Sequence, residues 1–177
     1  MPRLPERPNL DHLRKQAKDL LAQYRRRDPT ALARFRTSLP AATGRDAAAI
    51  AGLALRLHDA QSCLAREYGI ASWADLRSFV EAQSAAPAGH PASVLAWLRL
   101  VYPGHIAGGV NRARPQVAAR MLAVQPRLAE GDLHIACAIG DVARLRRAVS
   151  DDPAWVNRAG GTLNLPPLVA VTHSGLL

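Results

Sequence analysis

Two stretches of the sequence decide the expected fold: VAARMLAVQPRLAEGDLHIA at residues 117–136 and VARLRRAVSDDPAWVNRAGG at residues 142–161. Each begins with Val-Ala, continues with apolar residues at helical spacing, and then has a proline-bearing turn followed by an apolar anchor. Short helices that recur in this way are typical of a solenoid, in which each unit buries its apolar face only against its neighbours. We therefore expect a stack of short helices in the C-terminal half.

The segment LHIACAIGD, residues 133–141, resembles the first-helix signature PLHxAAxxGH of ankyrin repeats. The segment PLVAVTHSG, residues 167–175, resembles the same helix of a following repeat. The step from His134 to Val169 is close to the family period of about 33 residues. Two features depart from the family pattern, because Val169 stands where the signature has histidine and Asp151–Trp155 lengthens a loop.

The resemblance implies a degenerate repeat at 94–130, a repeat at 131–163 and a partial repeat at 164–177, so we expect a truncated solenoid that stops one helix into a repeat. It also implies that six residues hold the repeats together: Leu133, His134, Ala136, Gly140, Leu145 and Asn157. Ankyrin repeats bind proteins through their loop tips and inner helices and perform no chemistry. The expected partner is therefore a protein, with no cofactor and no metal.

Local signals at positions 1–85 predict four further helices. Asn9 can cap a helix, and Asp28 followed by proline can start a second. A third helix is expected over residues 45–68, where Gly69 follows in the position favoured for a left-handed cap. Ser72 begins the fourth, with an acidic residue three positions later as in a capping box.

The whole chain is therefore expected to be all-α. It divides into a helical leader domain at 1–85, a small-residue linker at 86–91 and the ankyrin-like solenoid at 92–177. LRKQAKDLL at 13–21 and LHDAQSCLAREYGIASWADL at 57–76 resemble the leader segment that precedes ankyrin repeats in some bacterial proteins of unassigned function. That resemblance implies an architecture and no activity.

Composition excludes several classes of protein. The chain has 177 residues, 49% of them hydrophobic and 21% charged, which suits a folded core rather than a disordered chain. No apolar run approaches the roughly 18 to 20 residues of a membrane span, and the N-terminus lacks the apolar stretch of a secretion signal. The two cysteines, Cys63 and Cys137, favour a reducing cytoplasm over a disulfide scaffold.

Catalysis is not indicated by any motif. One acid–base grouping falls on the expected third helix: His58, Asp59, Glu67 and Tyr68. No nucleophile or glycine elbow accompanies it. His134 and Cys137 lie one turn apart but supply two of the four ligands of a structural zinc site. Cys63 is expected to be a small buried hydrophobe, because no basic cluster is present to lower its pKa. We expect no enzyme.

Arginines are the main candidates for partner contact. The net charge is +9, and guanidinium groups match carboxylate and phosphate geometry. Arg144, Arg146 and Arg147 form a cluster in the repeats, from which Arg144 and Arg147 are predicted contacts together with Trp155. Trp155 follows Pro153 in an expected exposed turn, and exposed tryptophan is a frequent interface anchor. The alternative for Trp155 is that its ring folds back over the repeat pair.

Two further interpretations stay open at this point. Residues 1–40 contain ten basic and four acidic side chains, including the run Arg25-Arg26-Arg27, so the N-terminal helices could bind nucleic acid. That interpretation ranks second, because no nucleic-acid motif or interleaved aromatic residue accompanies the charge. In the other interpretation, the chain is a fragment of a larger protein whose active part lies beyond residue 177.

Overall fold

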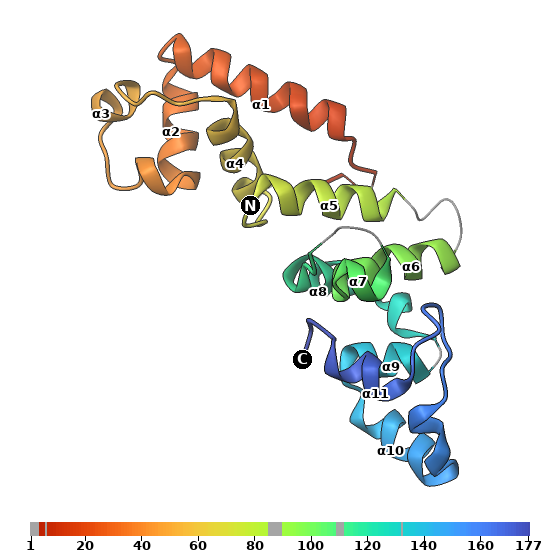
Figure 1. Cartoon of the computed structure of the whole chain (residues 1–177). Helices are drawn as coiled ribbons and strands as arrows, with labels where there is room; N and C mark the ends of the chain where they lie inside the picture. The colour runs from red at the N-terminus through yellow and green to blue at the C-terminus, as the bar shows by residue number, and fades with distance from the viewer. Residues whose placement is uncertain (1–3, 6, 85–89, 109–111, 132) are drawn as a thin grey trace. The chain divides into compact units, whose positions relative to one another are not determined.

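The computed structural model describes residues 4–5, 7–84, 90–108, 112–131 and 133–177. It divides into two compact units, unit 1 (Met1–Val80) and unit 2 (Glu81–Leu177). Helices dominate both units (Figure 1), and the described residues contain one isolated β-bridge and no strand. The expected all-α class is confirmed. Within the described ranges, no helix has both the length and the apolar character needed to cross a bilayer.

Unit 1 is built on α1 (Leu10–Arg25), whose buried face packs against α4 (Leu57–Glu67) and α2 (Pro29–Ser38). The predicted N-caps are in place. The side chain of Asn9 accepts two backbone N–H groups at the start of α1, and the side chain of Asp28 does the same for α2. The first and second predicted helices are confirmed, because their start signals are local in the sequence.

The single helix expected over residues 45–68 is wrong. The chain instead forms α3 (Ala47–Ala51) and then α4, with an irregular segment between them. The buried Tyr24 hydroxyl is hydrogen-bonded to the carbonyl oxygens of Ile50 and Leu53. The Tyr24 hydroxyl therefore satisfies carbonyl oxygens at the end of α3. In a continuous helix, the N–H groups of the next turn would bond to these oxygens.

Local caps define the remaining helix boundaries of this region. Asp59 accepts the N–H of the residue before α4 at 2.8 Å, which restarts the helix. Gly69 follows α4 with φ +71°, in the predicted left-handed conformation. The Ser72 Oγ accepts the N–H of Asp75 at 3.1 Å, as expected for the cap of α5 (Trp73–Gln83).

Unit 2 begins with three helices and a 3-10 helix: α6 (His90–Val101), α7 (Gly104–Ala107), α8 (Pro115–Val124) and η3 (Pro126–Ala129). His90 and Pro91, expected in the linker, instead form the start of α6, where proline is tolerated because its missing N–H needs no intrahelical acceptor. Residues 86–89 of that linker lie outside the described residues. The Trp97 indole donates to the carbonyl oxygen of Ala118 at 3.0 Å and fixes α6 to α8.

Four more elements complete unit 2: α9 (Leu133–Ile139), α10 (Val142–Asp151), η4 (Pro153–Asn157) and α11 (Pro167–Thr172). Figure 1 shows α9 beside α11, and α9 packs against both α10 and α11. Gly140, at φ +71°, makes the tight turn from α9 to α10. A loop closed by the bridge between Gly160 and Leu165 leads into α11.

The pair α8–η3 recurs as α10–η4. Each pair is a ten-residue helix, one intervening residue and a 3-10 helix that begins with proline. The bounds of the two pairs align in one register, which matches Pro115 with Val142 and Pro126 with Pro153 and is called the structural register below. The Val-Ala pairs in the sequence had instead matched Val117 with Val142. The two registers differ because α8 begins at Pro115, ahead of its Val-Ala pair, whereas α10 begins at the valine itself.

Candidate functional site

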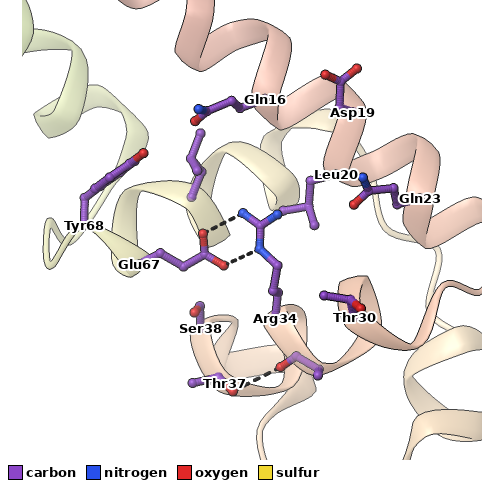
Figure 2. A pocket seen from close by; sticks show the side chains of 12 residues that line it. Gln16, Asp19, Leu20, Gln23, Thr30, Arg34, Thr37, Ser38, Glu67 and Tyr68 are labelled. Carbon is purple, nitrogen blue, oxygen red and sulfur yellow. Dashed lines mark hydrogen bonds and ion pairs between the residues drawn. The ribbon is translucent and has the colours of Figure 1, made fainter. Parts of the chain in front are cut away.

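A groove of about 700 Å³ in unit 1 opens between α1, α2 and the end of α4 (Figure 2). Arg34 and Glu67 meet in it in a two-point ion pair, with Nε to Oε1 at 2.8 Å and Nη2 to Oε2 at 2.7 Å. Amide and hydroxyl side chains surround the pair: Gln16, Gln23, Thr30, Thr37 and Ser38. Polar side chains thus surround an ion pair whose charges compensate each other.

The ion pair determines the chemistry available in this groove. Its hydrogen bond to Glu67 raises the pKa of Arg34 above the usual value for arginine. The Cys63 sulfur lies 3.8 Å from Glu67 Oε1 and 3.6 Å from the carbonyl oxygen of Arg34. Burial, reinforced by the Glu67 charge, raises the pKa of the Cys63 thiol to about 12. Cys63 is thus a buried thiol, as predicted, and stays protonated at neutral pH.

The acid–base grouping noted in the sequence is divided between two roles. The exposed His58 lies 3.3 Å from the neighbouring Asp59, which also caps α4. Glu67 is two turns further along the helix and belongs to the ion pair with Arg34. In the described part of the chain, no three histidine, cysteine or acidic side chains gather in an arrangement that could hold a metal ion.

Arg144, a predicted partner contact, is engaged within unit 2. Its guanidinium group donates to the carbonyl oxygens of Ala129 at 3.3 Å and Gly131 at 2.5 Å. Both acceptors lie in the segment that leads into α9. Arg144 therefore ties α10 to the preceding chain, and its hydrogen-bonding groups are directed to the protein itself.

Trp155, the predicted exposed anchor, lies in η4 and is half-buried. Its ring meets the His134 imidazole edge to face, with centroids 5.8 Å apart. In the structural register Trp155 matches Leu128, which is 1% exposed in η3. The expected exposure of Trp155 is therefore wrong, because the ring folds back over the repeat. His134 is enclosed on another side by Gly160 and Gly161, where an added Cβ would lie 2.7 Å from its atoms.

Arg147, the third predicted contact, is exposed, and so is Arg146. Neither guanidinium group has a hydrogen bond or ion pair with any other described residue. Beside them, Val142 is 54% exposed and Val149 is 40% exposed. These four residues are called the α10 face below. Neither valine was among the predicted contacts, although two valines seven positions apart on an arginine-rich helix are a signal that the sequence carries.

The basic run at the end of α1 is also exposed, at Arg25, Arg26 and Arg27. All Trp, Tyr and Phe side chains lie among the described residues, and none of them is exposed. Proteins that bind single-stranded nucleic acid stack bases on accessible aromatic rings. The basic run therefore offers charge without a stacking platform.

No family model, curated protein or solved structure matches this chain. Function must then be inferred from the two sites themselves, which differ in one respect. The charged pair in the groove of unit 1 is satisfied internally. The guanidinium groups of Arg146 and Arg147 on the α10 face are not satisfied by any described residue.

Proposed function

We propose that this chain is a non-catalytic protein-interaction module, with an ankyrin-like solenoid in unit 2 and a helical leader in unit 1. The observation that carries the proposal is the α10 face, where exposed valines lie beside unpaired guanidinium groups on a helix packed against its neighbours. Because the packed helices hold this face in place before a partner arrives, little ordering entropy opposes binding.

Three features of unit 2 support the ankyrin-like interpretation. The α8–η3 pair recurs as α10–η4, so a helical unit repeats, although the step from Pro115 to Val142 is 27 residues and shorter than the ankyrin period of about 33. The first-helix candidates α9 and α11 pack side by side, and a bridged loop precedes α11. His134, the residue that matches the signature histidine, packs against the glycine pair of that loop. Each feature is what stacked repeats with protruding loops require.

The groove of unit 1 offers no catalytic arrangement in support of an enzyme. Its ion pair is internally compensated, and its thiol is held in the protonated form. Its arrangement provides no activated nucleophile next to a free base. Both cysteines, Cys63 and Cys137, are buried and unbridged, which fits the reducing cytoplasm that we propose as the location.

Affinity capture with matched variants tests the proposal. The full chain is immobilised and exposed to a nuclease-treated extract of the source cells at about 50 and 300 mM salt, a range over which phosphate-driven binding collapses. The wild type is compared with V142D on the α10 face and with V124D on α8. Val124 is a fair control because it is 56% exposed in the same unit.

We expect a discrete protein that the wild type and V124D retain at high salt and that V142D loses. Equal recovery by all three proteins would contradict a role for the α10 face. Recovery of nucleic acid alone, without nuclease and at low salt, would favour the N-terminal interpretation. R26E, an exposed change in the basic run, would then abolish recovery.

A further inference from the structure

The apolar residues of the α10 face form a row that follows the helix. Val142 and Val149 are seven positions apart, or about 10.5 Å along the axis at about 1.5 Å per residue. Leu145, half-buried, continues the row toward the packed side of the helix. Spacing of three, four and seven positions is the seam against which a second helix packs. Ala148 is the buried residue that holds the other side of α10 in place.

Unpaired positive charge borders this row. At about 100° per residue, Arg146 lies about 40° from Val142 around the helix and borders the row, whereas Arg147 lies about 140° from Val142. Neither has a partner among the described residues. Among the described residues, no ion pair joins either arginine to the acids at the end of the helix: Asp151 is exposed, and Asp152 is 2.8 Å from Arg158.

The valine row and the positive charge beside it favour one class of partner for the α10 face over others. A second copy that docked symmetrically on this face would bring its own Arg146 and Arg147 against the same groups, within the roughly 8 to 10 Å over which charges interact in physiological salt. A nucleic acid would satisfy the guanidinium groups but would leave the valines against a charged backbone. A helix with apolar residues along one side and carboxylates beside them satisfies both parts of the face.

We infer that the α10 face is the docking site for an amphipathic helix with acidic flanks. This inference rests on the proposed function and names its partner class. The partner helix lies along α10, with its apolar side on Val142 and Val149 and a carboxylate paired with Arg146, while Arg147 adds positive charge further around the helix. Because α10 has ten residues and spans about 15 Å, the contact covers roughly three turns of the partner. A contact of this size is typical of a weak, transient complex.

Synthetic helical peptides provide the probes for the test. The acidic probe has a leucine seam flanked by glutamates, the basic probe has the same seam flanked by lysines, and the polar probe has glutamates beside a serine seam. Fluorescence anisotropy measures the affinity of each probe for the full chain. We expect the acidic probe to bind at least about tenfold more tightly than either of the others.

Variants of the α10 face give the sharper result. V142D lowers the affinity for the acidic probe about tenfold, while V124D leaves that affinity unchanged. Aspartate at the first position of α10 suits a helix N-terminus, so V142D is expected to fold. R146E/R147E reverses the preference, so that the variant binds the basic probe more tightly than the acidic one.

Equal binding of the acidic and basic probes, or no binding of the acidic probe, would overturn the inference. Concentration-dependent self-association that V142D abolishes, measured by analytical ultracentrifugation, would assign the face to a second copy instead. The two proposals fail separately. If the acidic probe does not bind but capture from extract still depends on Val142, the partner class is wrong and the interaction module stands. If capture is also independent of Val142, the proposed function fails as well.

Discussion

Replacement of Arg144 by alanine tests whether this side chain stabilises the fold of unit 2 or contacts a partner. The guanidinium group of Arg144 donates to the carbonyl oxygens of Ala129 and Gly131, so R144A removes two hydrogen bonds between α10 and the chain before α9. Hydrogen bonds from a charged donor contribute about 1.5 to 3 kcal/mol each when protected from solvent. Arg144 is half-exposed, so water competes for both acceptors. We therefore expect a loss of about 1 to 2 kcal/mol in the free energy of unfolding of unit 2.

Urea unfolding followed by far-UV circular dichroism measures this loss, and hydrogen exchange of residues 142–151 localises it to α10. For a unit of this size, each loss of about 1 kcal/mol lowers the melting temperature by about 4 to 8 °C. R147A is the matched control, because Arg147 lies on the same helix with an unpaired side chain, and its substitution is expected to change stability by less than about 0.5 kcal/mol. If R144A keeps the stability of the wild type but loses partner capture, the structural role of Arg144 is refuted and its predicted role as a partner contact is supported.

Three further changes test the packing described above. G161A places a Cβ 2.7 Å from the His134 side chain at φ +67°, so it should destabilise unit 2 by about 2 kcal/mol in a thermal melt, and a wild-type melting temperature would contradict this. E67Q leaves the half-buried Arg34 without its carboxylate, so we expect about 1 to 2 kcal/mol of lost stability in urea, against no change if the pair were merely a surface contact. Because burial raises the pKa of Cys63 from 9.0 to about 12, the native thiol should resist alkylation at about pH 8, and rapid native-state labelling would argue against its burial. The same shift makes the unfolded chain lose its thiol proton first, so stability falls as the pH rises above about 9, and C63A should fall less steeply.

Local sequence signals were sufficient wherever one residue determines a boundary. Asn9 and Asp28 cap their helices, and Gly69 adopts its left-handed conformation, as predicted. The helix expected over residues 45–68 failed because its interruption depends on Tyr24, whose hydroxyl reaches backbone acceptors 26 and 29 residues later in the chain. Periodicity alone does not reveal a hydrogen bond across that distance.

The candidate sites were less predictable than the helices, for the same physical reason. Arg34 and Glu67 are 33 residues apart, so no spacing rule joins them, and Glu67 was grouped with its sequence neighbours instead. The proline turn before Trp155 suggested exposure, but the ring is covered through its contact with His134. The 40% exposure of Val149 likewise depends on which helices pack against α10, which the sequence does not reveal.

The central claim, that the α10 face is the binding surface, is tested most directly by nuclear magnetic resonance. The isotope-labelled full chain of 19.0 kDa is titrated with the acidic helical probe while its backbone amide shifts are followed. We expect shift changes concentrated at residues 142–150, with residues 24–27 and the groove around Arg34 unchanged. Changes centred on the basic run at 25–27 or on the groove, with α10 unaffected, would contradict the claim.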